Sequence, residues 1–457
     1  MTVARYDLLR RALWLGRVLR SRLLQPALML VTLVVFTLAI VTGLFGTPAG
    51  SRNFGIVFVW IVWWALLIVV LVPLFGRVWC MMCPIPAPGE WLQRRAIVRR
   101  NPGRPRTLRK RWPRRLKNMW LQNIGFLGVA LFSGVILTRP SVSAVVLLAF
   151  PLIALGLSLL YENRVFCRYV CPVGGFIGLY AMMAPLELRT RDCSTCRLHR
   201  TKDCVAGNAQ GYGCPWMVYP GNLDRNTYCG MCMECFKTCP KDNITLNLRP
   251  FGADLFVSKS HRLDEAYKAF IMLGCALLYS AVFLGPWGWL KSWASLESLP
   301  NWLLYAAGLL AIVLALIPGL FRLCAALSDR LAGHRAGSRF VTYAYTLVPL
   351  GLAAWIAFSL GFVFVNGSYA LSVISDPFGW GWNLFGTAHM PWTPFAPQLL
   401  SFLQVGVLTG GLLFAASMTV RFAGDGMVDA RRALVAGLPV IAFQLVMTLA
   451  FLWLYLG

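Results

Sequence analysis

Long apolar stretches separated by short polar ones dominate the chain. The hydrocarbon core of a bilayer, about 30 Å thick, needs roughly 20 consecutive apolar residues in a helix. We therefore predict nine transmembrane helices, near residues 25–46, 54–76, 120–138, 142–161, 266–285, 302–321, 341–365, 398–420 and 433–456. The third and fourth are short and separated only by Thr138-Arg139-Pro140, which indicates a tight helical hairpin.

Charge is scarce but strongly one-sided. Charged residues make up 13% of the 457 residues and hydrophobic residues 58%, yet the net charge is +26. A soluble domain carries about 25% charged residues, so the composition excludes an ordinary soluble protein. With the N-terminus inside, only Arg52, Arg139 and Lys291 of the 43 lysines and arginines fall outside. The positive-inside rule thus predicts an all-α polytopic membrane protein with its N-terminus in the cytoplasm and its C-terminus outside.

One cysteine run carries the most specific chemistry. Residues 229–240 read CGMCMECFKTCP, which has the spacing C-x2-C-x2-C-x3-C-P. Bacterial ferredoxins bind [4Fe–4S] clusters with this run, and in two-cluster ferredoxins its fourth cysteine ligates the other cluster. A zinc knuckle and unconnected core thiols are the alternatives, although zinc sites commonly use two separated pairs.

A stretched copy of the same pattern lies upstream, and it too ends in Cys-Pro. By crossed ligation, one cluster would take Cys193, Cys196, Cys204 and Cys239, and the other would take Cys229, Cys232, Cys235 and Cys214. A zinc site is the alternative for the first set. Residues 189–262 are the one sizeable polar segment, so we predict a small cytoplasmic ferredoxin-like insert that holds two [4Fe–4S] clusters.

An internal duplication provides a third group of thiols. The phrase Arg-Val-aromatic-Cys, running on to Cys-Pro, occurs at residues 77–84 and again at 164–172, each time after the second helix of a hairpin. Residues 25–188 therefore form duplicated hairpins. Their helix-end cysteines are a candidate third redox or metal site, as a metal centre, a cluster or a dithiol: Cys80, Cys83, Cys167 and Cys171. Alternatively, Cys-Pro only terminates each helix, and apolar surroundings leave the thiols inert.

The remaining segments suggest membrane contacts. Residues 1–24 form a basic amphipathic cytoplasmic segment, and the polybasic loop 94–117 favours anionic lipid headgroups or an acidic protein over nucleic acid. An apolar run from Pro172 to Leu188 predicts a re-entrant or surface-lying helix. Residues 263–457 form a five-helix region without a cofactor motif. Its aromatic outer loop, 366–397, is an interfacial belt or a docking surface for an outer partner.

Several motifs are missing from the sequence. None of the four histidines lies convincingly within a predicted span, and no C-x-x-C-H occurs, so we expect no haem. No nucleotide-binding glycine fingerprint is present. Acidic residues are few in the spans, which disfavours a carboxylate-based proton pump.

The paired helix-end Cys-Pro phrases and the two-cluster segment resemble a membrane polyferredoxin superfamily over roughly residues 25–250. Its members include the nitrous-oxide-reductase regulator, the ferredoxin-type membrane subunit of periplasmic nitrate reductase, and the copper-reducing accessory protein of cytochrome oxidase. The spacing Cys80/Cys83 is one residue shorter than the usual C-x3-C-P. The regulator's outer flavin-binding domain has no counterpart before the first helix, so we expect no covalent flavin.

The resemblance implies a bacterial inner-membrane protein with its clusters on the cytoplasmic side. It would relay electrons between a quinol or cytoplasmic donor and a respiratory partner, such as a c-type cytochrome or reductase on the outer face. We expect an electron-transfer subunit rather than a stand-alone enzyme. A metal-handling assembly factor with cluster-dependent copper reduction, and a structural subunit braced by its clusters, are the alternatives.

Overall fold

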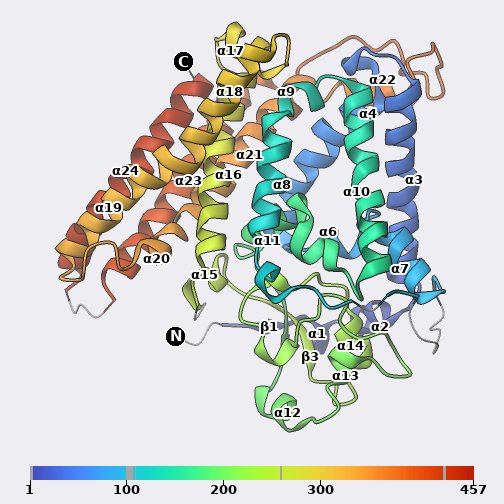
Figure 1. Cartoon of the computed structure of the whole chain (residues 1–457), viewed down its shortest axis with the longest axis vertical. Coiled ribbons are helices and arrows are strands. Elements are labelled where there is room, and N and C mark those ends of the chain that lie inside the picture. The colour runs from blue at the N-terminus through green and yellow to red at the C-terminus, as the bar shows by residue number, and fades with distance from the viewer. Residues whose placement is uncertain (1–3, 99–105, 109, 258–259, 426–428, 457) are drawn as a thin grey trace. The chain divides into compact units, whose positions relative to one another are not determined.

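The computed structural model describes residues 4–98, 106–108, 110–257, 260–425 and 429–456, which form mostly helices (Figure 1). Contacts divide the chain into two compact units. The first unit comprises residues 1–41, 70–122 and 144–259, and the second comprises residues 42–69, 123–143 and 260–457. Neither unit coincides with one of the segments predicted from sequence, because each unit combines stretches that lie far apart in the chain.

Eight helical stretches among the described residues are long and apolar enough to cross a bilayer. They are α3 (Leu24–Phe45), Phe54–Phe75, α10 (Pro140–Leu160), α16 (Leu263–Phe283), Leu299–Leu331, Phe340–Asn366, α23 (Pro397–Ala423) and α24 (Ala430–Leu456). Each overlaps one of the nine predicted spans. The chain is thus a largely helical, polytopic membrane protein.

The third predicted span, residues 120–138, is divided in the structure. It forms α8 (Trp120–Leu131) and α9 (Ser133–Ile136), and Phe132 between them has the non-helical angles φ −102° and ψ 10°. The 12 residues of α8 extend about 18 Å, which is shorter than the bilayer core. The predicted count of nine spans is therefore not confirmed, and the orientation in the membrane stays a prediction.

The second unit is a helical bundle. Its helix α21 (Leu347–Asn366) packs against α23, and α24 packs against both α23 and α19 (Ile317–Leu331) (Figure 1). The buried amide of Gln444 in α24 donates to the hydroxyls of Thr346 and Thr419, both at 2.8 Å. Such polar ties join helices that have no hydrophobic driving force between them in lipid.

The first unit contains a three-stranded antiparallel sheet in the order β1-β3-β2. The strands are β1 (Tyr6–Asp7), β3 (Ile244–Leu248) and β2 (Leu186–Thr190). Tyr6 and Leu186 flank Leu248 on its two sides. The central strand β3 therefore pairs with residues from the start of the chain and with residues that precede the ferredoxin-like segment.

The N-terminal segment packs on this sheet. Its helices α1 (Leu8–Arg11) and α2 (Leu13–Arg20) bury Leu9 and Leu19 in the same core as Leu246 of β3. Arg5 also pairs with the buried Glu187 at 2.6 Å. Sequence periodicity indicated a membrane-facing segment. In the structure, part of the apolar surface of this segment is buried in a protein core instead. An amphipathic pattern does not specify what covers its apolar face.

The apolar run after Pro172 changes structure partway. It begins as α11 (Pro172–Tyr180), but residues 186–188 belong to β2 instead of continuing the predicted helix. Part of the predicted polybasic loop, residues 99–105 and 109, lies outside the described residues. Helix α7 (Ala87–Arg94), which matters for the site below, ends at the first residue of that loop.

Candidate iron–sulfur centres

The first cysteine set is built on short helices of the first unit. Cys193 and Cys196 lie on α12 (Cys193–Leu198), Cys204 lies on α13 (Asp203–Ala206), and Cys239 follows α14 (Glu234–Thr238). Asp192 caps α12 by accepting from the backbone N–H groups of Ser194 and Thr195, both at 2.9 Å. The cap ends the preceding extended chain and starts the helix at the first cysteine.

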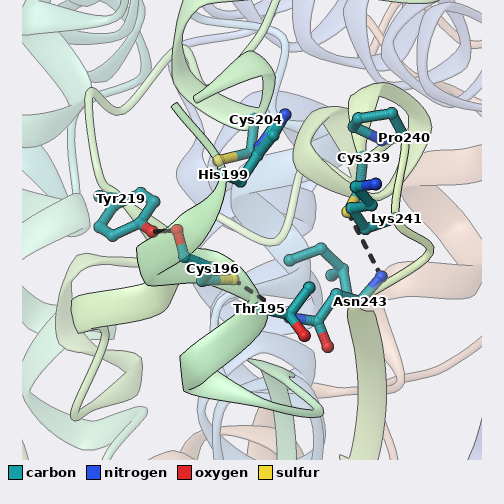
Figure 2. A pocket seen from close by; sticks show the side chains of 10 residues that line it. Thr195, Cys196, His199, Cys204, Tyr219, Cys239, Pro240, Lys241 and Asn243 are labelled. Carbon is teal, nitrogen blue, oxygen red and sulfur yellow. Dashed lines mark hydrogen bonds between the residues drawn. The ribbon is translucent and has the colours of Figure 1, made fainter. Parts of the chain in front are cut away.

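Three thiols of this set line one pocket, which Figure 2 shows from close by: Cys196, Cys204 and Cys239. Burial, together with the nearby Cys196 and Cys239 sulfurs, raises the pKa of the Cys204 thiol to about 11. Cys193 is exposed and does not line the pocket, although its Sγ lies 3.6 Å from the Thr190 hydroxyl. The structure thus brings three of the four predicted ligands together and places the fourth on the same short helix as Cys196.

Asn243 is a functional candidate that sequence reasoning missed. Its side-chain Nδ2 donates to Cys196 Sγ at 3.2 Å, and its backbone N–H donates to Cys239 Sγ at 3.3 Å (Figure 2). N–H donors to ligand sulfurs are the interactions by which proteins tune iron–sulfur clusters. Asn243 lies four residues after Cys239, just before β3, and no general pattern in the sequence marked it.

The second set converges in the interior of the same unit. Burial raises the pKa of the Cys214 and Cys229 thiols to about 11 and that of Cys232 to about 12. Burial also raises the pKa of Cys235, and the sulfurs of the other three cysteines raise it further. The four predicted ligands are therefore electrostatic neighbours.

The backbone of the cysteine loop is left-handed at two residues between Cys229 and Cys235. Met231 has a φ of 47° and Met233 a φ of 60°. Such turns aim successive N–H groups inward, as in anion-binding nests.

One buried donor tests whether this set suits a cluster. The indole of Trp216 is 1% exposed, and its Nε1–H has no hydrogen-bond partner among the described residues. It lies directly against the cysteine loop, because a Cβ at Gly230 would stand only 1.9 Å from that nitrogen. An orphaned N–H beside four thiols fits a cluster sulfur as its acceptor, since buried donors are otherwise satisfied.

The helix-end cysteines also come together. Cys80 lies in α6 (Val78–Met82) and Cys83 directly follows it, whereas Cys167 lies in the π-helical turn Phe166–Val170 with Cys171 next. Burial raises the pKa of the Cys83 thiol, and the Cys171 and Cys80 sulfurs raise it further. Burial likewise raises the pKa of Cys167, and the other three sulfurs of this set raise it further.

The π-helical turn explains the unequal spacing of the two phrases. A π-helical turn contains one residue more than an α-helical one. The C-x3-C of the second phrase is wound as a π-turn, and the C-x2-C of the first phrase follows an α-helix. The shorter spacing at Cys80/Cys83 thus does not separate the two pairs.

The helix-end phrases contact residues that lie one or two positions from cysteines of the second set. The backbone N–H of Arg164 donates to Pro215 O at 2.9 Å. The guanidinium of Arg168 donates to Trp216 O, and that of Arg77 donates to Thr227 O, two residues before Cys229. Among the described residues, no three His, Cys, Asp or Glu side chains are grouped to hold a single metal ion.

Comparisons with known proteins support the iron–sulfur interpretation. A family described as "4Fe-4S binding domain" matches residues 56–105 and 143–187, the two stretches that contain the helix-end phrases. The "Putative electron transport protein YccM" of Escherichia coli K12 is 24% identical over 133 residues, which cover 28% of this chain and 34% of that protein.

Two archaeal proteins are also similar. The "Uncharacterized protein MJ0749" of Methanocaldococcus jannaschii is 31% identical over 103 residues, covering 22% of this chain and 37% of that protein. "Uncharacterized protein MJ0750" from the same organism is 30% identical over 84 residues, covering 18% of this chain and 30% of that protein. The chain thus spans about a third of the length of these relatives. No solved structure matches it significantly.

The chain is therefore a membrane-type 4Fe–4S protein, and its likeness supports iron–sulfur electron transport.

Proposed function

We propose that the chain conducts single electrons through three adjacent cysteine-ligated centres in its first unit. The observation that carries this proposal is that eleven of the fourteen cysteines gather in three groups of thiols. The helix-end set and the second set contribute four each, and the first set contributes three, with Cys193 on the same short helix as Cys196. The two cysteines outside these groups, Cys275 and Cys324, lie in the second unit. When bound, a [4Fe–4S] cluster takes up and releases one electron at a time.

The chain's own residues would hold the centres close enough for relay. Helix α14 carries Cys235 of the second set and leads into Cys239 of the first, so one rigid element joins both sets. The contacts from Arg77, Arg164 and Arg168 join the second set to the helix-end set. The match of the 4Fe–4S family to both helix-end phrases favours a third cluster there over a helix terminator.

We propose further that the donor is a quinol or a cytoplasmic reductant and that the acceptor belongs to a respiratory reductase or cytochrome on the outer face. The resemblance to the polyferredoxin superfamily and the "electron transport" name of the E. coli relative support this placement. The excess of basic residues on the predicted inner side supports clusters on the cytoplasmic face of an inner membrane.

The iron content of anaerobically purified full-length protein tests the proposal. Three clusters correspond to about twelve iron atoms per chain, four for each cluster. The double variant Cys80→Ser/Cys171→Ser should lose about a third of the iron and one EPR signal. The matched double variant Cys275→Ser/Cys324→Ser should keep all of it. Unchanged iron after loss of the helix-end thiols would limit the chain to two clusters, and a colourless, iron-free wild type would refute the whole proposal.

Copper reduction is the competing function. An assembly factor would reduce Cu(II) stoichiometrically, with electrons from its clusters, and would bind the product at the helix-end thiols, because soft thiolates select Cu(I). A copper titration of the reduced protein distinguishes the two functions. Cu(II) reduction that disappears in Cys80→Ser/Cys171→Ser would favour the assembly factor.

A further inference from the structure

Arg77, the first residue of the first repeated phrase, is a buried cation that has no acidic partner in the described part of the chain. Its side chain is 3% exposed, and its guanidinium stacks 4.3 Å from the ring of Trp216. One nitrogen donates to Thr227 O, while Nε and Nη2 have no hydrogen-bond partner among the described residues. A buried charge is costly unless it is paired, so this arrangement requires a negative group beside the guanidinium.

The equivalent arginine of the second phrase is fully paired. Arg164 donates from Nε to Glu90 Oε2 at 2.9 Å and from Nη1 to the carbonyl of Cys80 at 2.9 Å. Glu90 lies on α7 of the first repeat and also pairs with Arg94 at 2.5 Å. The acid of one repeat thus neutralises the arginine of the other.

The second repeat lacks the reciprocal acid. Glu90 stands seven residues after Cys83, and the residue seven positions after Cys171 is Gly178. A Cβ at Gly178 would lie 2.7 Å from Arg77 Nη1 and 3.2 Å from Thr227 O. The backbone of α11 therefore approaches the guanidinium so closely that no carboxylate side chain fits between them. At the position where the duplication predicts a neutralising glutamate, the chain has Gly178. The space beside this glycine is filled by the guanidinium of Arg77.

The uncompensated charge lies between two cysteine sets. Thr227 and Trp216, its two contacts, each stand two residues from a cysteine of the second set, Cys229 and Cys214 respectively. Burial raises the pKa of the Cys171 and Cys229 thiols to about 11, and the Arg77 guanidinium opposes the rise at both. One cation is thus within electrostatic reach of a helix-end thiol and of a thiol in the ferredoxin-like loop.

We infer that Arg77 is the counter-charge of the iron–sulfur centres at the helix ends and at Cys214/Cys229/Cys232/Cys235, and that it raises their reduction potentials. The inference rests on the proposed function, since it needs clusters at these thiols. A thiolate-bound cluster becomes more negative when it accepts an electron, so a fixed cation beside it favours the reduced form. The N–H groups of Arg77 and Trp216 that have no partner among the described residues would donate to the sulfurs of such a cluster.

The test is a potentiometric titration of the anaerobically purified full chain, followed by EPR. Arg77→Gln removes the charge and should shift the potentials of the two neighbouring centres downward. Arg77→Lys keeps the charge and should restore most of the shift. Glu90→Gln frees the charge of Arg164 and should shift the potentials upward. The exposed Arg17→Gln is the matched control and should change nothing, and the centre at Cys193/Cys196/Cys204/Cys239 serves as an internal reference.

The possible outcomes separate the two levels of the argument. A wild type without clusters refutes the proposed function. Full iron content with unchanged potentials in Arg77→Gln overturns the role of Arg77 and leaves the proposed function intact. If Arg77→Gln fails to assemble its clusters, Arg77→Lys decides: assembly near the wild-type potential supports the counter-charge, and failure of this variant as well overturns it.

Discussion

Single polar side chains lie beside the candidate centres of the first unit, and the cysteine spacings did not reveal them. The cysteine spacings predicted which thiols belong together. Asn243, Trp216 and Arg77 each lie within four residues of a cysteine, but they contact Cys196, Gly230 and Thr227 in segments that only the fold brings near. Arg77 opens a repeated phrase, whereas no periodicity or motif marks Asn243 or Trp216, because their contacts depend on where neighbouring backbone passes.

Asn243 offers the most direct measurement of this kind. Asn243→Ala removes the N–H that donates to Cys196 Sγ, and loss of a donor to sulfur destabilises the reduced, more negative cluster. We expect a lower potential for the first centre and unchanged potentials for the other two, in EPR-monitored redox titrations. The exposed Asn222→Ala is a control, because the same substitution is made at a side chain that faces solvent. An equal shift in all centres would contradict the assignment of Asn243 to the first set.

A buried ionic network beneath the sheet predicts a large effect on stability. Arg249 pairs with Glu187 at 2.9 Å and with Asp254, and all three are at most 6% exposed. Arg249→Met leaves two buried carboxylates with one cation fewer. This substitution should lower the free energy of unfolding by about 3–5 kcal/mol. Arg5→Met, whose partly exposed side chain contacts the same Glu187, should cost about 0–1 kcal/mol. Thermal unfolding followed by circular dichroism measures both, and equal losses would contradict the network.

The same network predicts a dependence on pH. Burial raises the pKa of the Glu187 carboxyl, but Arg189, Arg249 and Arg5 together hold that pKa below its ordinary 4.5. A depressed folded-state pKa stabilises the fold at pH values above the ordinary pKa and loses this effect as the pH falls through the folded-state value. The stability difference between wild type and Glu187→Gln should therefore stay constant above about pH 5 and shrink in more acidic buffers. If the stability difference between wild type and Glu187→Gln stayed constant down to pH 3, the lowered pKa of Glu187 would be contradicted.

Short helices and turns position the ligands, and their caps are local enough to predict from sequence. Asp192 precedes Cys193 and accepts from Ser194 and Thr195, by backbone and by hydroxyl. These hydrogen bonds hold the pKa of Asp192 well below its usual range, so the cap persists in mildly acidic buffer. The π-turn at Cys167 is different, since it follows from a one-residue insertion whose winding the spacing alone did not reveal.

The cap of α12 can be tested separately from ligation. Asp192→Ala should fray the helix and make the first centre lose iron faster to a chelator, while the second centre, on other elements, keeps its iron. Asp192→Asn retains a good capping residue and should behave nearly as wild type. Chelation kinetics followed by visible absorbance and EPR measure the loss, and equal rates in the two variants would argue against the cap.

The path of the whole chain through the membrane depends on residues 120–138. The helix-end thiols of both repeats are neighbours, so the chain between Cys83 and Cys167 must return to the side from which it started. Since α10 is long and apolar enough to cross once, we expect the preceding stretch to cross as well, although α8 alone is too short. Hydropathy predicted one continuous span over residues 120–138. It did not show the break at Phe132, because hydropathy averages over a window and does not report backbone angles.

Reporter fusions test this path. An alkaline phosphatase fused after Arg139 should be active, because the tip of the hairpin would lie outside, and a green fluorescent protein fused there should stay dark. Fusions after Arg200, within the ferredoxin-like segment, should give the opposite pair of results. Inactive phosphatase after Arg139 would place that tip inside and would require a different path.

The pairing of β1 with β3 also constrains biogenesis. A ribosome adds about 5–20 residues per second, so roughly 10–50 s separate the synthesis of Tyr6 from that of its partner Leu248. During that interval the first strand has no partner, and the early helices enter the bilayer while the sheet is still incomplete. The proposed first centre, whose Cys239 and Asn243 directly precede β3, would therefore reach its final surroundings only after β3 has left the exit tunnel.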